Sequence, residues 1–225
     1  MLWLVFGGIG CGKSVFADEL ALAVGREGIR LSCPSFPLGE TLIPGETGES
    51  RFYKTRSEAD ETLPGKINAI NLESNFFRAE RRVVVVDSLS GWLRASFTRS
   101  AGRGTEIDGV RMKVEQMTEV DAAGFELSRR MESDGAGIEA ARWRETLDAI
   151  LAFEGRMIVV TEEPAAGLNP SPEELEYARR LSEANRELLQ ASHSVYRMTA
   201  GMAMELKGYR LKGRGNRDEN IHADR

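Results

Sequence analysis

Apolar residues along this chain gather in short runs that are bounded by charged residues, glycine or proline. The clearest runs are residues 2–6, the four valines at 83–86 and the segment 156–164. Short apolar runs of this kind predict strands that are buried on both faces, as in the middle of a parallel sheet. Weaker apolar stretches predict a short strand and a proline-rich turn at 29–37, and a last strand at 193–202.

Apolar residues at helical spacing lie between these runs. On this basis we predict helices at residues 15–24, 111–132, 139–153 and 171–192. The last helix has a clear start, because Ser171 is a preferred N-cap residue and is followed by proline and acidic residues. Strands that alternate with helices predict an α/β fold with a mainly parallel sheet flanked by helices.

The segments between these elements carry weaker signals. Residues 38–66 are polar, with several glycines and prolines, and predict loops, as do the glycine-rich and charged residues 98–110. Residues 67–80 fit neither a helix nor a strand pattern. We expect residues 1–208 to form a single domain and the charged residues 209–225 to form a mobile tail.

The first predicted strand runs directly into GGIGCGKS, which matches the phosphate-binding pattern G-x-x-x-x-G-K-[ST]. Glycines let such a loop curl with its N–H groups inward, and the following helix adds free N–H donors and a positive dipole end. In this pattern Lys13 reaches the outer phosphates of a nucleotide, and the Ser14 hydroxyl binds Mg²⁺. Strand, loop and helix in this order predict a P-loop NTPase-type (RecA-like) fold rather than a structural turn. The residues predicted to bind the nucleotide are Gly7, Gly8, Ile9, Gly10, Cys11, Gly12, Lys13, Ser14, Ser32, Cys33 and Pro34.

Carboxylates end two of the buried runs. Asp87 follows the valines, where a P-loop protein carries the carboxylate that holds Mg²⁺ directly or through water. We therefore predict Ser14 and Asp87 as metal ligands, with a helix cap as the plainer role for Asp87. Glu162 and Glu163 end the third run, at the edge where such sheets bind ligands. Capping and catalysis are equally open roles for them, and we predict Lys13, Asp87 and Glu163 as catalytic residues.

The composition argues against several classes of protein, namely nucleic-acid-binding, disulfide-rich, secreted and membrane proteins. The chain has 225 residues, a net charge of −5 and two cysteines. This charge gives no basic field for nucleic acid, and the two cysteines give neither a disulfide framework nor a metal site. No apolar run reaches membrane-spanning length, and an N-terminal strand that enters the phosphate-binding loop leaves no room for a cleavable signal peptide. We therefore expect a cytoplasmic protein without nucleic-acid or membrane partners.

Three sequence motifs and several single residues follow one another in an order typical of one family. GGIGCGKS comes first, VDSLSGWL follows at residues 86–93, and EEPAAGLNP follows at residues 162–170. The later residues that match the family pattern are Asn185, Val195, Gly201 and Lys207, and Ala203 stands where the family has a proline. In this order the chain resembles the bifunctional adenosylcobinamide kinase/adenosylcobinamide-phosphate guanylyltransferases of cobalamin biosynthesis. That family carries G-G-x-x-x-G-K-S, V-D-x-L-x-x-W-L and N-E-V-G-x-G-I-V-P.

The resemblance implies two reactions. The first moves the terminal phosphate of ATP or GTP onto the aminopropanol hydroxyl of adenosylcobinamide. The second transfers GMP from GTP onto that phosphate through a covalent GMP-histidine. The resemblance also implies Mg²⁺ as a cofactor, a corrinoid substrate beside the nucleotide, and a homotrimer with sites near the subunit interfaces.

The histidine of the second reaction is missing. The family carries it in R-I-x-x-H-R after the second strand, and the nearest stretch here, RFYKTR, has Thr55 in its place. The chain's two histidines are His193 and His222, so no alignment of the first 190 residues supplies one. A threonine hydroxyl needs an adjacent base and forms a stable ester, whereas imidazole forms a labile phosphoramidate at neutral pH. We therefore expect kinase activity, which needs no protein nucleophile, and doubtful guanylyl transfer.

Three hypotheses remain open from the sequence. Lys13, Ser14 and Asp87 favour a cobinamide-type kinase. The missing histidine and residues 38–80, which match the family poorly, favour a relative that binds nucleotide without turnover. Because family contacts to GTP and the corrinoid lie partly in that segment, a P-loop kinase for another small alcohol is the third hypothesis.

Overall fold

The computed structural model describes residues 1–34, 52–73, 81–102, 137, 140–164 and 169–206. Its strands are β1 (Leu2–Gly7), β2 (Glu27–Ser32), β3 (Tyr53–Glu58), β4 (Arg82–Asp87), β5 (Arg156–Val160), β6 (Ser194–Thr199) and β7 (Met202–Glu205). They form one seven-stranded sheet in the order β3-β2-β4-β5-β1-β6-β7. All neighbouring strands run parallel except β6 and β7, which form an antiparallel hairpin.

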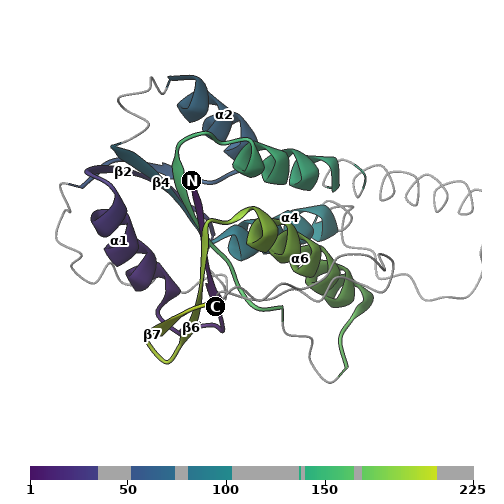
Figure 1. Ribbon diagram of the computed structural model, residues 1–225. Helices are drawn as coiled ribbons and strands as arrows, with labels where there is room; N and C mark the ends of the chain where they lie inside the picture. The colour runs from purple at the N-terminus through teal and green to yellow at the C-terminus, as the bar shows by residue number, and fades with distance from the viewer. Residues whose placement is uncertain (35–51, 74–80, 103–136, 138–139, 165–168, 207–225) are drawn as a thin grey trace, which may run out of the picture.

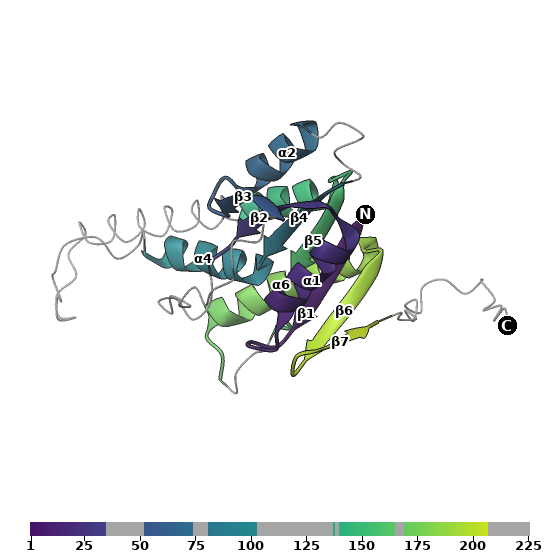
Figure 2. The same ribbon diagram turned by 90° about the vertical axis from the view of Figure 1, so that its left-hand side faces the viewer.

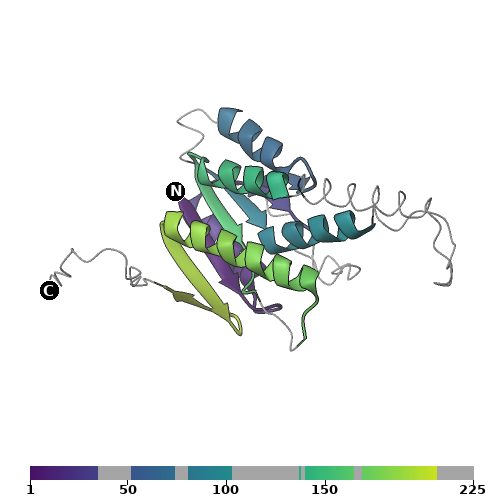
Figure 3. The ribbon, with the colours of Figure 1, turned by 90° about the vertical axis from the view of Figure 1, so that its right-hand side faces the viewer.

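Helices cover both faces of this sheet. They are α1 (Lys13–Val24), α2 (Leu63–Glu73), α4 (Leu89–Gly102), a helix at residues 140–151, and α6 (Pro172–Ala191). Among them, α1 covers one face, which Figure 2 views from the front, whereas α4, α6 and the helix at 140–151 cover the other (Figures 1 and 3). This arrangement, with a phosphate-binding loop after β1, confirms the predicted α/β fold of the P-loop NTPase (RecA-like) type.

The valine run of β4 shows why the sheet is buried on both faces. Val83 and Val85 pack in the cluster that includes Ala17 of α1, whereas Val84 and Val86 pack in the cluster on the opposite face. None of the four valines is exposed to solvent. Alternate residues of a strand point to opposite faces, so an unbroken apolar run predicts helices on both sides. The prediction of a central parallel strand is confirmed, because β4 pairs with β2 and β5.

The motif VDSLSGWL joins this strand to α4, which packs against it. Leu89, Trp92 and Leu93 are fully buried and lie on one face of α4. Trp92 stacks on Trp143 of the helix at 140–151, with ring centroids 5.9 Å apart. Its indole Nε1 donates a hydrogen bond of 2.8 Å to the carbonyl oxygen of Asp60, just before α2. The apolar positions of the motif therefore fix the layer of helices behind the site.

The prediction of loops at residues 38–66 was wrong for its described part, residues 52–66, whereas residues 38–51 lie outside the described residues. This segment contains β3 and the start of α2, which continues into the residues that fitted neither pattern. The strand was missed because β3 lies at the edge of the sheet and most of its side chains are polar and exposed. The helix was missed because Pro64 falls in the first turn of α2, where proline is tolerated.

The ends of α4 and β6 also differ from expectation. The helix α4 continues to Gly102, so residues 98–102 are helical rather than loop. The predicted last strand at 193–202 is a hairpin, because β6 ends at Thr199 and β7 begins at Met202. The helix predicted at 111–132, residues 103–110 and the tail at 209–225 lie outside the described residues. No helix in the described ranges has the length and apolar character that a membrane crossing needs.

The helix α6 has one apolar and one charged face. It begins after the predicted cap: the Ser171 hydroxyl accepts a hydrogen bond from the Glu174 backbone N–H, and the Glu174 side chain accepts one from the Ser171 N–H. Its residues Tyr177, Leu181, Ala184 and Leu188 are buried in the core. This amphipathic pattern explains why its position was predicted closely.

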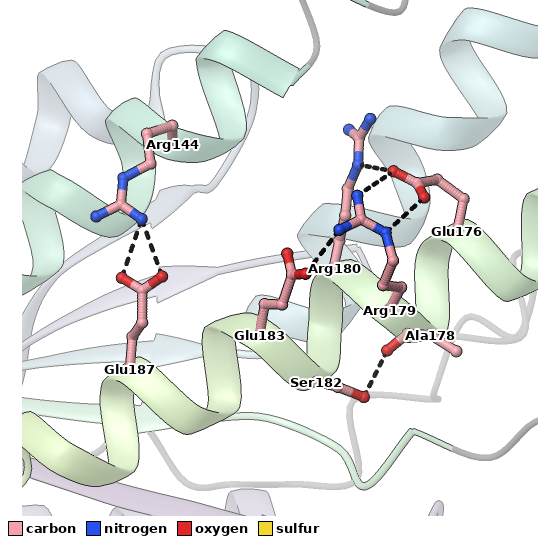
Figure 4. A network of polar contacts seen from close by, with 8 residues as sticks. All are labelled: Arg144, Glu176, Ala178, Arg179, Arg180, Ser182, Glu183 and Glu187. Carbon is pink, nitrogen blue, oxygen red and sulfur yellow. Dashed lines mark hydrogen bonds and ion pairs between the residues drawn. The ribbon is translucent and has the colours of Figure 1, made fainter. Parts of the chain in front are cut away.

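Ion pairs follow the charged face of α6 (Figure 4). Glu176 accepts hydrogen bonds from Arg179 and Arg180, at 2.9 and 2.7 Å. The Arg179 hydrogen bond and the neighbouring Arg180 hold the pKa of Glu176 at about 2. Arg144 of the helix at 140–151 donates to Glu187 at 2.9 Å, which joins the two helices at the surface. Exposed pairs of this kind add little stability individually, so the buried face of α6 dominates its packing.

We predict that Gly91→Ala destabilises the protein. A Cβ atom at Gly91 would lie 2.0 Å from the carbonyl oxygen of Pro34, which is a backbone atom that cannot move aside cheaply. Overpacking of this kind lowers the free energy of unfolding by about 1–3 kcal/mol. Urea unfolding followed by circular dichroism measures the change.

The matched control is Gly65→Ala in α2. A Cβ atom there has no neighbour within 4 Å, so alanine raises the free energy of unfolding, by about 0.5–1 kcal/mol. Equal effects of the two substitutions would contradict the close packing of Pro34 on α4.

Candidate nucleotide-binding site

The segment that joins β1 to α1 has a positive φ, which glycine adopts most easily, at Gly7, Gly10 and Gly12. Gly7 has φ +154°, and a Cβ atom there would lie 2.5 Å from the carbonyl oxygen of Met198. Gly12 has φ +90° in the left-handed region and is the N-cap residue of α1. The glycines that identified the motif are therefore required by the conformation of the loop, and the predicted order of strand, loop and helix is confirmed.

The hairpin between β6 and β7 supports this loop. Ala200 and Gly201 form its turn, and both have positive φ, as two-residue hairpins prefer. The backbone N–H of Gly201 donates a hydrogen bond of 3.1 Å to the carbonyl oxygen of Cys11. Gly201, which the family resemblance singled out, thus lies against the phosphate-binding loop.

Lys13 is folded back onto its own loop. Its side chain is only 8% exposed, and Nζ donates a hydrogen bond of 2.6 Å to the carbonyl oxygen of Gly8. The carboxylate oxygen Oε1 of Glu162 lies 4.0 Å from Nζ. A phosphate group that entered the loop would compete with both oxygens for this ammonium group.

Ser14 and Asp87 meet at the carboxyl edge of the sheet. Ser14 lies in the first turn of α1, and Asp87 ends β4, which is separated from β1 by β5 alone. The Ser14 hydroxyl donates a hydrogen bond of 3.1 Å to Oδ1 of Asp87. Burial raises the pKa of Asp87, and the positive charge of Arg30 and the Ser14 hydrogen bond oppose that rise. The structure thus brings the two predicted metal ligands into direct contact.

The oxygen atoms of this pair fit a magnesium ion. Mg²⁺ is usually held by one or two carboxylates together with phosphate and water oxygens, rather than by a cage of protein ligands. A hydroxyl and one carboxylate beside a phosphate-binding loop supply that donor set. In the part of the chain that the structure describes, no three His, Cys, Asp or Glu side chains gather as a metal site.

Arg30 is a site residue that we did not predict from the sequence. On β2, its guanidinium group donates to Oδ2 of Asp87 through one nitrogen and to Oδ1 of Asp18 through the other. The Tyr53 hydroxyl donates to the same Asp18 oxygen. Burial disfavours charge on Arg30, but the two carboxylates outweigh it and raise its pKa. Two features of the sequence could have indicated this contact. One is an arginine within a predicted apolar strand, and the other is an aspartate one helical turn after Ser14.

The predicted nucleotide-binding residues at the end of β2 and directly after it lie close to Asp87. The backbone N–H of Cys33 donates a hydrogen bond of 2.7 Å to the Asp87 carbonyl oxygen, and Ser32 accepts one from Ala59. Burial, together with the nearby Asp87 charge, raises the pKa of the Cys33 thiol well above its usual value. Pro34 packs on Gly91 of α4. Contacts of Ser32, Cys33 and Pro34 with a nucleotide stay a prediction.

The two glutamates after β5 have different neighbours. Glu162 faces Lys13, whereas Glu163 forms an ion pair of 3.1 Å with Arg197 of β6 and is about half exposed. The backbone N–H of Glu163 donates to the Gly7 carbonyl oxygen at 3.3 Å. Asn185 of α6 contacts the residues that follow β5, because its side-chain amide donates a hydrogen bond of 2.8 Å to the Glu162 carbonyl oxygen. Glu163, which we predicted as a catalytic residue, therefore lies next to the start of the phosphate-binding loop.

The residues that bear on guanylyl transfer lie away from the loop. Thr55 is exposed on β3, four strand positions from β1, or roughly 19 Å across the sheet. His193 directly precedes β6, where its backbone N–H donates to the Leu2 carbonyl oxygen and its ring contacts Trp3 edge-on. That contact supports the structural role for His193. His222 lies outside the described residues.

The fold and this loop define a nucleotide-binding P-loop protein. Residues 53–206 match the family described as cobinamide kinase / cobinamide phosphate guanyltransferase, which is more than half of the chain. The chain therefore belongs to that family, and the match begins after the phosphate-binding loop. No curated protein matches the chain. Among solved structures, an ATPase domain aligns over 87% of this chain and 68% of that one, with 9% identity and a TM-score of 0.36.

We predict that Glu162→Gln tightens the binding of metal-free ATP. The substitution removes the carboxylate that faces Lys13, so less interaction is lost when the ammonium group turns to phosphate. The two groups lie 4.0 Å apart, and weak pairs are worth up to about 1 kcal/mol, so the dissociation constant should fall by about threefold to fivefold. Titration of a fluorescent ATP analogue in EDTA measures it.

Glu163→Gln is the matched control, because it makes the same chemical change one residue later, at a side chain that faces Arg197. An equal gain in affinity from both variants would show that general charge, rather than the contact with Lys13, governs binding.

Proposed function

We propose that this protein is a nucleotide-dependent phosphotransferase of the adenosylcobinamide kinase type. It would move the terminal phosphate of ATP or GTP onto the aminopropanol hydroxyl of adenosylcobinamide. The observation that supports this most strongly is the Ser14–Asp87 contact of 3.1 Å beside Lys13. It occurs in a chain that belongs to the cobinamide kinase / cobinamide phosphate guanyltransferase family.

The loop residues supply binding and charge neutralisation. Backbone N–H groups of the loop and of the first turn of α1 would surround the phosphates, and Lys13 would leave the Gly8 carbonyl to contact the outer ones. Ser14 and Asp87 would hold Mg²⁺, which neutralises charge on the phosphates when it is bound. Phosphoryl transfer depends mainly on such positioning and electrostatic stabilisation, and these residues provide both.

Glu163 would act on the acceptor. Its carboxylate lies at the rim of the loop and can accept the proton of a hydroxyl that approaches the terminal phosphate. The ion pair with Arg197 would orient this carboxylate. Glu162 would instead act on Lys13, since it faces that side chain.

Guanylyl transfer is not part of the proposal. No histidine occurs before residue 193, and Thr55 is exposed on an edge strand that lies four strand positions from the phosphate-binding loop. A hydroxyl there has no imidazole-like nucleophilicity. We extend the proposal, by family resemblance, to a cytoplasmic homotrimer whose substrates are a nucleotide and a corrinoid.

We expect the purified protein to transfer the label of γ-labelled ATP or GTP to adenosylcobinamide when Mg²⁺ is present. Lys13→Ala should lower the rate by at least about a hundredfold, because the ammonium group stabilises charge in the transition state. Lys66→Ala, at a lysine of α2 that pairs with Asp60, is the matched control and should keep the wild-type rate. Tight nucleotide binding without labelled corrinoid would favour another acceptor or a relative without turnover.

We predict that Glu163→Gln lowers kcat by about a hundredfold or more and changes the nucleotide dissociation constant little, as loss of a general base does. Steady-state kinetics with saturating adenosylcobinamide separates the two parameters. Glu173→Gln, at an exposed position in the first turn of α6, is the control. Unchanged turnover in Glu163→Gln would remove this residue from the catalytic set.

A further inference from the structure

Both carboxylate oxygens of Asp87 have a defined partner. Oδ1 accepts the hydrogen bond of the Ser14 hydroxyl, and Oδ2 accepts one from the Arg30 guanidinium group. The side chains of Asp87 and Arg30 are 9% and 17% exposed, so little water competes for these contacts. The two oxygens are therefore distinct: one faces the phosphate-binding loop, and the other is occupied by a cation of the protein.

Arg30 is itself held from two further directions. Asp18 of α1 accepts a hydrogen bond from its other terminal nitrogen, and the Tyr53 ring lies 5.7 Å from its guanidinium carbon. A planar guanidinium group that binds two carboxylates through different nitrogens has little rotational freedom. Arg30 therefore fixes the orientation of the Asp87 carboxylate, which otherwise could rotate to present both oxygens to an ion.

We propose that Arg30 is a specificity-determining residue, which makes Asp87 a one-oxygen ligand and thereby favours Mg²⁺ over Ca²⁺ in the nucleotide complex. Ca²⁺ takes about six to eight oxygen ligands and often uses both oxygens of a carboxylate. Mg²⁺ takes about six at shorter distances and near-octahedral angles, to which a carboxylate contributes one oxygen. The inference rests on the proposed function, because it takes the ion to bind with a nucleotide beside Ser14.

The test compares two charge-balanced double variants. Arg30→Met with Asp18→Asn removes one positive and one negative charge. Asp87 then loses the hydrogen bond from Arg30, while the local net charge is unchanged. The control, Arg82→Met with Glu27→Gln, removes an arginine of similar exposure together with its carboxylate partner, at the starts of β4 and β2 and away from Asp87. Removing Arg30 alone would leave two carboxylates without a counter-charge, which can prevent folding.

The dissociation constant of a fluorescent ATP analogue is measured with saturating Mg²⁺ and then with saturating Ca²⁺, after circular dichroism shows that each variant is folded. The readout is the ratio of the Ca²⁺ constant to the Mg²⁺ constant. We expect a ratio above one in the wild type and in the control. In the Arg30/Asp18 variant it should fall by about tenfold, the usual effect of losing a partner of a metal ligand. Arg30→Lys, which keeps the charge but not the planar fork, should give an intermediate ratio.

Two results would overturn the proposal while nucleotide binding stays intact. An unchanged ratio in the Arg30/Asp18 variant would show that Asp87 orientation does not select the ion. An equal fall of the ratio in the Arg82/Glu27 control would show that loss of a buried ion pair, rather than the orientation of Asp87, changes the ion preference. If the wild type binds no nucleotide with either ion, the proposed function fails first, and the inference fails with it.

Discussion

The position of one carboxylate, Asp87, links the core of this protein to its site. It ends a strand whose four valines are inaccessible to solvent, so burial on two faces fixes where the strand stops. At that point Asp87 contacts Ser14 on one side and Arg30 on the other. Burial of a carboxylate is unfavourable without such partners. The contacts of Asp87 with Ser14 and Arg30 therefore hold β4, α1 and β2 together at this point. The phosphate-binding loop is thereby placed beside the carboxylate that we propose as a metal ligand.

The charges of the site are paired within the protein itself. Lys13 contacts the Gly8 carbonyl and lies near Glu162, Arg30 binds two aspartates, and Glu163 binds Arg197. These contacts keep the side chains ordered near the positions that they need for phosphate and metal. Binding of a nucleotide would exchange protein partners for phosphate oxygens at Lys13, while Arg30 could keep its partners. This division separates groups that act on the ligand from groups that position others.

The features that were predictable from the sequence are local ones. The phosphate-binding loop follows from residues 7–14, and the central strand follows from four adjacent valines, because each pattern dictates its own backbone. The edge strand β3 was missed because most of its side chains are polar and exposed, and the hairpin strand β7 was missed because it has only four residues, all of them exposed. The role of Arg30 depends on contacts among β2, β4 and α1, and no spacing along the chain encodes them. For the same reason, the different neighbours of Glu162 and Glu163 required the structure.

The central claim is that this family member carries phosphoryl transfer without guanylyl transfer. The most direct measurement is the mass of the corrinoid product after adenosylcobinamide is incubated with the protein, GTP and Mg²⁺. GTP can serve both reactions, so a single sample tests them together. Adenosylcobinamide phosphate as the end product is the predicted result. A product that carries GDP would contradict the claim, because the family forms it through a covalent GMP-histidine and this chain has no histidine before residue 193.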